Sequence, residues 1–324
     1  MIERQWLTPT QLRAFAATVR FGSVKAAAAD LSVSEAAISM HIAHLRKELG
    51  DKLFTRAANG LAFTPGGLRL ASRAAEMLGL QERTIIEVSQ AGSGRRLLRV
   101  AASSLFAEYA APGLIELFAS RADDLNIELS VHNPNKFGSL LLTRTVDVAI
   151  GPRPGIIDDS MTCTLFLNYQ MLAVVGAGHP LAGVRVTPAE LREQTWLLGP
   201  SAVGGVGIVP SVLRRLNVPE HNQRIFQSHA AAVEEAKHGK GVALGMSFAV
   251  SKDLADGDLR QLDGAFLRAR GSWHILALPD RDAPPAAAEL RRFVTTPRAT
   301  QAMLRGAGVT AGRFRPAIHV TLWS

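Results

Sequence analysis

The sequence predicts an N-terminal helical unit, a long connecting helix and a C-terminal α/β domain of two lobes. Three observations support this prediction. Apolar residues recur at helical spacing from about residue 9 to 48, a second helical pattern runs from 66 to 89, and β-rich runs alternate with helical ones from 97 onward. With 324 residues, 47% of them hydrophobic and 20% charged, the chain is long enough for two or three domains with their own cores.

The first region divides into three short helices. Stops at Gly22, Ser32 and Gly50 interrupt the helical pattern. Residues that can accept a hydrogen bond from a free helix N–H precede each piece: Thr8 or Thr10, Ser23, and Ser34. Ser32 and Glu35 form a second capping pattern, so the sequence leaves the start of the third helix uncertain by about two residues.

The second and third helices have the layout of a helix-turn-helix. Such a pair needs small residues where the helices cross, here Ala27 and Ala28, and a tight turn, here closed by Leu31 and Val33. An apolar face then holds the third helix in place, and its predicted members are Ile38, Ile42, Leu45 and Leu49. Burying this face leaves the other side chains of the helix to project outward or along its flanks.

The outward side chains of the third helix suit the base edges of a DNA major groove. They are Ser34, Glu35, Ala36, Ser39, Met40 and, further along, His44 and Lys47. Serine hydroxyls donate or accept there, and an alanine can touch a thymine methyl group. Nearby basic side chains are candidates for phosphate contacts: Arg20, Lys25, Arg46, Lys52 and Arg56. A helical bundle with solvated charges explains the same periodicity, so the pattern alone leaves both interpretations open.

A hairpin and a long helix follow. The segment DKLFTRAANGLAFTPGG predicts two short strands around Asn59-Gly60, a strong turn dipeptide. Between Gly66 and Ser89, residues at alternating spacings of three and four predict a coiled-coil seam: Ala71, Ala74, Leu78, Gln81, Ile85 and Val88. Its polar member can fix register in a dimer, while a lone helix packed on its own domain is the alternative. QAGSGRR, residues 90–96, predicts a flexible hinge.

The C-terminal region predicts a two-lobed α/β domain. Its β-rich runs are LLRVAA, NIELSV, VDVAIG, YQMLAVVG, TWLLG, RIFQS, GVALG and SWHILAL, with helices expected between them, among others near 105–119, 136–144 and 284–294. This alternation is typical of a parallel, doubly wound sheet. About 200 residues of this kind exceed one comfortable domain and favour two lobes. The cleft between them is where small ligands bind.

The segment SVKAAAADLSVSEAAISMHIAHLRKELGDKLFTRAANGLAFTPGG resembles the N-terminal signature of the LysR-type transcriptional regulators. The resemblance includes LF-x-R after the third helix and T-x-x-G before the linker helix, and the order of hairpin, linker and two-lobed domain extends it over nearly the whole chain. It implies a sequence-specific DNA-binding regulator controlled by a small-molecule effector. The alternative is a ligand-binding or catalytic α/β domain fused to a helical module that does not bind DNA.

The resemblance also implies the domain organisation. We expect an all-α winged helix-turn-helix over 1–65 and a dimerisation helix over 66–91. An effector domain like the periplasmic binding proteins then occupies 92–324. Lobe 1 is expected at about 97–165 plus 270–324, and lobe 2 at about 166–269. The implied partners are double-stranded DNA, a small-molecule effector for which an anion is a candidate, further copies of the chain in a homodimer or homotetramer, and RNA polymerase.

The third helix departs from the family pattern. Glu35-Ala36 stands where the family typically has Gln-Pro, and Met40 and His44 replace basic or amide residues. A carboxylate repels phosphates but can accept a hydrogen bond from cytosine N4, so Glu35 is expected to select sequence at some cost in affinity. The predicted DNA-binding residues are Lys25, Ser34, Glu35, Ala36, Ser39, Met40, His44, Lys47, Lys52 and Arg56.

The predicted effector-binding residues follow the family's cleft. The resemblance points to the loop after the first strand and to GPSAVGGVGIVPSVLRRL in the second lobe, both leading into helix N-termini that suit a carboxylate or phosphate. Further candidates stand at strand ends, where each taken alone is more often an ordinary loop residue. The full set is Ser103, Ser104, His132, Asn133, Arg153, Ser201, Gly204, Gly205, Ser228 and His229.

Other kinds of chemistry are not expected. HGKG, residues 238–241, lacks the spacing of a phosphate-binding loop, and GMSFA, residues 245–249, lacks the last glycine of a serine nucleophile turn. His41 and His44 have no evident third metal ligand. We therefore expect no cofactor, no metal and no enzymatic activity.

The sequence also allows predictions about the cellular location and the C-terminal tail. The charged N-terminus, the lone Cys163 and the lack of a long apolar run predict a cytoplasmic protein without membrane association. The net charge of +8 permits an acidic partner. The tail, residues 297–324, ends with AIHVTLW, for which an edge strand or a subunit contact competes with a disordered terminus.

Overall fold

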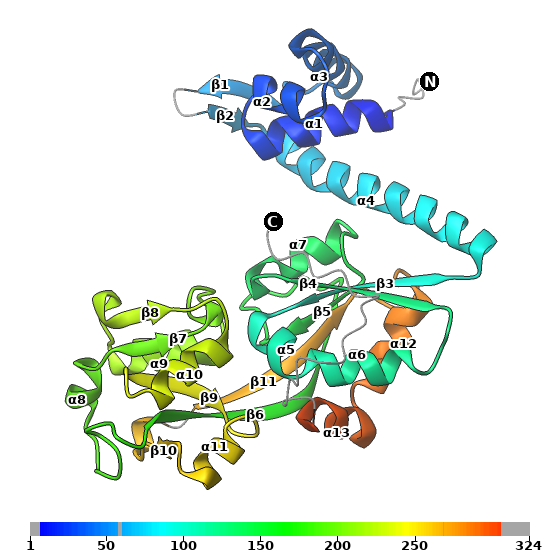
Figure 1. Ribbon diagram of the computed structural model, residues 1–324. Helices are drawn as coiled ribbons and strands as arrows, with labels where there is room; N and C mark the ends of the chain where they lie inside the picture. The colour runs from blue at the N-terminus through cyan, green and yellow to red at the C-terminus, as the bar shows by residue number, and fades with distance from the viewer. Residues whose placement is uncertain (1–6, 58–59, 268, 306–324) are drawn as a thin grey trace. The chain divides into compact units, whose positions relative to one another are not determined.

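The computed structural model describes residues 7–57, 60–267 and 269–305 (Figure 1). The chain divides into two compact units. The first runs to Ser93 and includes Leu142–Thr145, and the second comprises Gly94–Leu141 and the chain from Val146 onward. Each unit is described by itself.

The first unit consists of three helices, a hairpin and a long helix. Its elements are α1 (Pro9–Phe21), α2 (Val24–Asp30), α3 (Glu35–Leu49), β1 (Phe54–Ala57), β2 (Gly60–Phe63) and α4 (Pro65–Ser93). The two strands pair antiparallel, with Phe54 opposite Phe63. The predicted order of helix-turn-helix, hairpin and long helix is therefore confirmed.

Helix caps settle the starts that the sequence left open. The Thr8 side chain accepts from the N–H of Gln11, whose side chain accepts in return from the N–H of Thr8. Ser34 caps α3 by accepting from the N–H of Ala37 at 3.1 Å. Ser32, with φ of 52°, lies in the turn instead of capping the helix. The third helix therefore starts after Ser34.

The core of this unit confirms most of the predicted apolar face. Ile38, Ile42 and Leu45 are buried together with Phe15 of α1. Leu49 is 37% exposed, so its predicted place on the buried face is wrong. The reason is local, because α3 ends at Leu49 and the chain turns at Gly50, which adopts a left-handed conformation. The next buried apolar side chain is that of Leu53, in the segment before β1.

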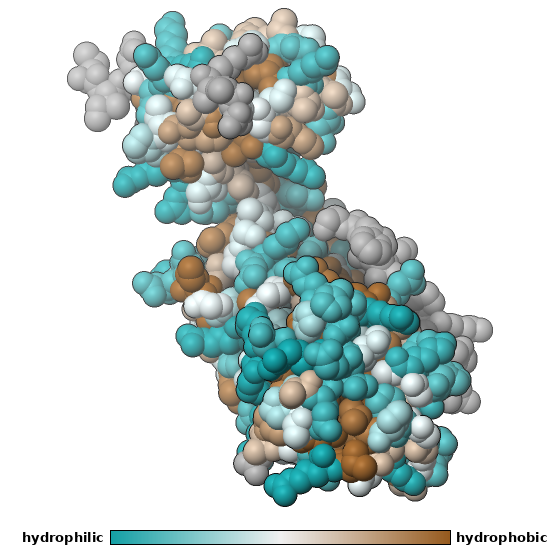
Figure 2. Space-filling view, turned by 90° about the vertical axis from the view of Figure 1, so that its left-hand side faces the viewer, coloured by the Kyte–Doolittle hydropathy of each residue, from teal (hydrophilic) through white to brown (hydrophobic). Residues whose placement is uncertain are grey.

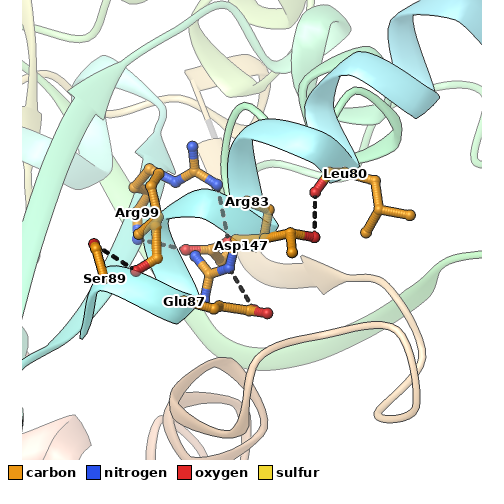
Figure 3. A network of polar contacts seen from close by, with 8 residues as sticks. Leu80, Arg83, Glu87, Ser89, Arg99 and Asp147 are labelled. Carbon is orange, nitrogen blue, oxygen red and sulfur yellow. Dashed lines mark hydrogen bonds and ion pairs between the residues drawn. The ribbon is translucent and has the colours of Figure 1, made fainter. Parts of the chain in front are cut away.

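Only the first part of the predicted coiled-coil seam on α4 packs within the unit. Ala74 is buried in the core of the unit, and Ala71 and Leu78 pack against that core. Ile85 and Val88 are 60% and 69% exposed. On the same helix the Arg83 guanidinium donates to the Glu87 carboxylate at 2.8 Å (Figure 3). The exposed end of the seam leaves apolar side chains available to a second helix.

The second unit holds the remaining elements. In chain order they are β3 (Arg96–Ala102), α5 (Ser104–Tyr109), α6 (Ala111–Ala119), β4 (Leu125–Val131), η1 (Pro134–Lys136), α7 (Phe137–Leu142), β5 (Val148–Gly151), β6 (Thr162–Gly176), α8 (Pro188–Arg192), β7 (Trp196–Leu198), η2 (Pro200–Ala202), α9 (Ile208–Leu216), η3 (Glu220–Asn222), β8 (Gln223–Ile225), α10 (His229–Lys237), β9 (Val242–Met246), α11 (Ser251–Asp256), β10 (Leu259–Gln261), η4 (Ala265–Leu267), β11 (Ala269–Ala277), α12 (Pro285–Phe293) and α13 (Pro297–Arg305).

The strands form one mixed sheet. The strand order is β4-β3-β5-β11-β6-β9-β7-β8, with β10 also paired to β6. The outer strands of each half pair in parallel, whereas β11 runs antiparallel to β5 and β6, and β6 antiparallel to β9. The predicted parallel pairing is confirmed for the outer strands of each half. It is wrong for the two long strands β6 and β11, which carry the chain between the halves and run antiparallel to their neighbours (Figure 1). The expected lobe limits at 165 and 270 fall inside these strands.

Two expected helices are interrupted. The helix expected near 105–119 consists of α5 and α6, separated at Ala110. Pro112 stands in the first turn of α6, where its missing N–H costs nothing because that position has no partner within the helix. The helix expected near 136–144 is the 3-10 turn η1 followed by the short α7.

Buried side chains fill both faces of this sheet. Trp196 and Trp273 are fully buried, and hydrophobic side chains appear only as scattered patches among hydrophilic ones on the face seen in Figure 2. Asp147 accepts from the backbone N–H of Arg99 at 2.8 Å and pairs with its guanidinium at 3.5 Å, which ties β3 to the segment before β5 (Figure 3).

The start of the predicted tail is ordered. Helix α13 packs on α6, and its Ala299 and Met303 are fully buried. A disordered terminus is therefore wrong for 297–305. The predicted edge strand AIHVTLW lies outside the described residues.

Candidate functional site

The predicted reading face of α3 is exposed. Its members are all solvent-exposed, while Ile38, Ile42 and Leu45 between them are buried; the members are Ser34, Glu35, Ala36, Ser39, Met40, His44 and Lys47. Met40 is 50% exposed. A helix with one face held in a core presents the opposite face as a fixed row, and this is the arrangement that a groove-reading helix requires.

The predicted phosphate contacts divide into two groups. Lys25 on α2 and Lys52 after α3 are exposed, and the side chain of Arg56 on β1 lies outside the described part of the chain. Arg46 donates to the carbonyls of Lys52 and Phe54, both at 2.7 Å, and lies 4.9 Å from the centre of the Phe54 ring. The guanidinium therefore holds the base of the hairpin, a structural role that the sequence did not predict, and its candidate phosphate contact stays a prediction.

The T-x-x-G element has a structural explanation. Asp51 accepts from the Thr64 hydroxyl and the Leu53 N–H, each at 2.6 Å, and these bonds lower the pKa of its carboxyl. The Thr64 hydroxyl also accepts from the N–H of Gly67 at 2.9 Å, which caps α4. A Cβ on Gly67 would stand 1.9 Å from the Leu53 carbonyl oxygen, so this position requires glycine. The element fixes where the hairpin ends and α4 begins.

A cavity of about 200 Å³ opens between the two halves of the second unit. Six of the ten predicted effector residues line it: Ser103, Ser104, His132, Asn133, Ser201 and Gly204. Apolar side chains from Tyr169 and from the segment that enters α9 complete the wall. The cavity therefore gathers residues that lie up to about a hundred positions apart in the chain, because both halves present their strand ends to it.

The other four predicted residues do not line the cavity. Gly205 adopts a φ of 69°, and its carbonyl accepts from Arg214. Ser228 caps α10 by accepting from the N–H of Ala231 at 3.1 Å. Arg153 is exposed beside Cys163; burial raises the pKa of that thiol, and the arginine acts in the opposite direction. His229 lies behind the cavity wall.

Ser103 is the most confined polar side chain of the wall. It is 5% exposed, and its hydroxyl has no hydrogen-bond partner within the described residues, although its N–H donates to the Ile150 carbonyl at 2.9 Å. A buried hydroxyl without a partner costs about 1–3 kcal/mol. A ligand group in the cavity can supply the missing bond.

His132 stands on the same side of the cavity. Its Nε2 lies 3.1 Å from the Ser130 hydroxyl. Burial, assisted by the charge of Lys136, lowers the pKa of this imidazole, so it faces the cavity mainly as a neutral ring near pH 7.

A hydrogen-bonded series behind the wall was missed at the sequence level. Glu108 Oε2 accepts from His229 Nδ1 at 2.7 Å, and His229 Nε2 lies 2.8 Å from the Ser201 hydroxyl. Burial raises the pKa of Glu108, but its bonds to His229 and to the first N–H groups of α10 outweigh burial and lower that pKa. The signal in the sequence was a single carboxylate inside the apolar run SLFAEYAAPGL.

Comparison with known proteins now identifies the chain. Residues 9–68 match the family "Bacterial regulatory helix-turn-helix protein, lysR family", and residues 91–297 match "LysR substrate binding domain". The chain belongs to the LysR family. It is a LysR-type transcriptional regulator with a helix-turn-helix DNA-binding domain and an effector-binding domain.

Individual relatives agree with this assignment. The HTH-type transcriptional regulator Rv0377 of Mycobacterium tuberculosis (strain ATCC 25618 / H37Rv) is 56% identical over 321 residues, covering 98% of this chain and 100% of that protein. The solved structure of ArgP from Mycobacterium tuberculosis has a TM-score of 0.59 at 18% identity, over 94% of this chain and 98% of the other. Full-length CbnR complexed with its target DNA has a TM-score of 0.55 at 18% identity, over 92% and 99%. The two structures show the shared fold.

For a LysR-type regulator, the alternative of a helical module that does not bind DNA is wrong, since residues 9–68 match the family's DNA-binding domain. LysR regulators bind DNA and small effectors, form oligomers, and are generally not enzymes. Among the described residues, no group of three or more metal-binding side chains occurs. None of the described helices has the length and apolar composition needed to cross a bilayer.

Proposed function

We propose that this LysR-type regulator reads its operator with the exposed face of α3 and is controlled by a small anion in the cavity of the effector domain. The observation that supports the DNA part most directly is the contrast along α3. Buried Ile38, Ile42 and Leu45 alternate with the exposed row from Ser34 to Lys47. Such a row can enter the major groove without unfolding any part of the unit.

Within the proposed interface, each exposed residue has a role set by its chemistry. The hydroxyls of Ser34 and Ser39 and the carboxylate of Glu35 offer hydrogen bonds to base edges, and Ala36 and Met40 offer apolar contact. Because the Ser34 oxygen accepts the capping bond, its proton remains free to donate. Lys25, Lys47, Lys52 and Arg56 supply phosphate contacts, with His44 beside them.

The anionic effector is supported by the donors of the cavity. Ser103 offers an unpartnered hydroxyl, and α9 enters at Gly207 with no side chain capping its free N–H groups. Free N–H groups and the helix dipole favour negative charge, so a carboxylate or phosphate can satisfy both. The remaining predicted effector residues do not line the cavity, so we propose that they affect the effector without touching it. They are Arg153, Gly205, Ser228 and His229.

The regulator is proposed to act as an oligomer in the cytoplasm. The exposed Ile85 and Val88 continue the seam of α4 and fit a homodimer through paired linker helices, with a tetramer built from two such dimers. RNA polymerase is the proposed downstream partner. Control requires only that the effector bind the two subunit arrangements with different affinity, and no chemical step is needed.

The DNA proposal is tested by titrating the purified chain against the DNA upstream of its own gene and against random DNA of equal length. A clear preference that weakens with salt is expected, because phosphate contacts release counterions. Replacing Lys47 with Ala should lower the slope of log affinity against log salt by about one. Equal affinity for both DNA molecules would contradict specific regulation.

The effector proposal is tested by a thermal-shift screen of small carboxylates and phosphorylated metabolites, because a ligand of the folded state raises the melting temperature. Ser103→Ala should reduce the shift of any active compound, and Ser139→Ala, on the exposed surface of α7, is the control. A shift that survives Ser103→Ala unchanged would remove the proposed site.

A further inference from the structure

The relay of Glu108, His229 and Ser201 (the polar relay) joins the two halves of the effector domain at the cavity wall. Glu108 comes from α5 in one half, and His229 and Ser201 from α10 and η2 in the other. Glu108 accepts bonds from the His229 N–H at 2.8 Å, from its Nδ1 at 2.7 Å and from the Ala230 N–H at 2.6 Å. Of the three relay side chains, only Ser201 lines the cavity.

The relay determines which way its protons point. An ionised carboxylate can only accept, so the imidazole of His229 carries its proton on Nδ1. A neutral ring with this tautomer leaves Nε2 without a proton, so Nε2 is an acceptor. Among the described residues, the Ser201 hydroxyl lies 2.8 Å from Nε2 and gives its proton to the neutral ring.

A hydroxyl that donates its single proton inward presents only lone pairs on its other side. Ser201 therefore meets the cavity as an acceptor. Ser103 differs from it, because its hydroxyl is buried and has no partner within the described residues, so its proton is available. The two serines give the cavity a donor position and an acceptor position.

The backbone at Gly199 is adapted to this geometry. A Cβ at this position would stand 2.4 Å from Cδ2 and 2.8 Å from Nε2 of His229. Real Cβ atoms do not approach a buried ring this closely, so glycine is what allows the imidazole to lie against the strand end and reach Ser201.

We infer that Glu108 and His229 fix Ser201 as a hydrogen-bond acceptor, and that the ligand of the cavity is a compact acid that also carries a hydroxyl or amino donor. This inference rests on the proposed anionic effector and specifies its second functional group. Ser103 and the start of α9 take the acid group, and Ser201 takes the donor. A plain carboxylate of the same size leaves the Ser201 acceptor without a partner, which is costly inside a cavity.

The test measures the binding of matched acids to the full-length protein by calorimetry. Two pairs, lactate and propionate and 3-hydroxybutyrate and butyrate, differ by one hydroxyl. A third pair, alanine and propionate, differs by an ammonium donor and its positive charge. At least one donor-bearing acid is expected to bind about tenfold more tightly than its plain partner. Equal affinity within every pair, including no measurable binding of any member, would overturn the inference.

Variants distinguish a specific effect of the relay on ligand preference from a general loss of structure. Ser201→Ala should abolish the advantage of the donor-bearing acid and leave the affinity for its plain partner unchanged. Gly199→Ala should do the same with all three relay side chains still present, because it displaces the imidazole. Ser139→Ala, on the exposed surface of α7 and outside the relay, should keep the advantage. An advantage that persists in Ser201→Ala would also overturn the inference.

Operator binding by the same preparations, measured without any acid, keeps the two proposals apart. If the acid pairs fail while the chain still prefers its upstream DNA, the relay inference is wrong and the DNA part of the proposed function stands. If the DNA preference is absent, the DNA part of the proposed function fails whatever the acids do.

Discussion

The reading face of α3 and the effector cavity differ in where their side chains come from in the chain and in how deeply they are buried. The side chains of the reading face lie within one stretch of fourteen residues, Ser34–Lys47, and are exposed. Those of the cavity come from separate loops of both halves, and behind its wall the buried His229 is hydrogen-bonded to the partly buried Glu108. Substitutions on the α3 face should therefore change what is bound with little effect on stability, whereas substitutions around the cavity should change both.

The largest effect is expected where the reading face depends on its core. Leu45→Ala removes a fully buried side chain and should lower the free energy of unfolding by about 2–5 kcal/mol. Loss of operator binding should follow, because α3 is no longer held. Chemical denaturation monitored by circular dichroism measures the change. Leu49→Ala, four residues along the same helix and exposed, should stay within about 0.5 kcal/mol. Equal losses would show that the helix has no preferred face.

The next effect concerns Glu108, the partly buried carboxylate of the relay. Glu108→Ala leaves two N–H groups and an imidazole without their acceptor and should cost about 1–3 kcal/mol at pH 7. Thermal unfolding of the variant and of Glu116→Ala, an exposed glutamate on α6, measures it. A matching loss in Glu116→Ala would mean that removing any glutamate from this face has the same cost.

The cost should also depend on pH, with a definite sign. The folded protein lowers the pKa of Glu108, so the carboxylate contributes stability above its unfolded value, near 4.5. That contribution is lost as pH falls through the lower, folded value. The stability difference between wild type and Glu108→Ala should therefore be full at pH 7 and shrink progressively below about pH 4.5. A difference that grows on acidification would contradict the assignment of Glu108 as an ionised acceptor.

Adjacent basic residues on α3 give a smaller and cleaner contrast. Arg46 donates to two carbonyls at the base of the hairpin, so Arg46→Ala should lower stability by about 1–2 kcal/mol. Lys47 is exposed, so Lys47→Ala should leave the unfolding curve unchanged and reduce only the salt dependence of DNA binding. Thermal unfolding measures the stability of both variants, and titration with DNA at several salt concentrations measures the salt dependence of their binding. If Lys47→Ala destabilises the fold as much as Arg46→Ala, the division between structural and DNA-facing charge is wrong.

The same contrast explains what the sequence could predict. Caps such as Ser34 and the stripe of Ile38, Ile42 and Leu45 are local, since a helix periodicity or a turn is set by residues three or four apart. Leu49 was misplaced because the periodic pattern continues to a residue at which the helix ends. The sequence makes Arg46 a candidate phosphate contact and does not show that carbonyls of a later hairpin lie within its reach.

Non-local features were less predictable. The prediction of a parallel sheet was wrong for β6 and β11. The alternation of strands and helices carries no information about strands that cross between the two halves. Ser103 and Ser201 were found through family resemblance, and Glu108 was missed because its partner is 121 positions away. A carboxylate within an apolar run is a usable signal for a buried polar network, but its partners emerge only once the chain is folded.

The smallest expected effect falls on one base pair. Glu35 is exposed in the first turn of α3, so replacing it with Gln should leave stability nearly unchanged. If its carboxylate accepts from a base edge, the preference at one operator position should shift by about 1 kcal/mol, because the amide both donates and accepts. Binding to a set of single-base operator variants measures the shift. Glu48→Gln removes the same charge from the far end of α3 and should strengthen binding to all variants alike. A uniform gain for Glu35→Gln, equal to that of Glu48→Gln, would leave Glu35 as a repulsive charge with no part in reading sequence.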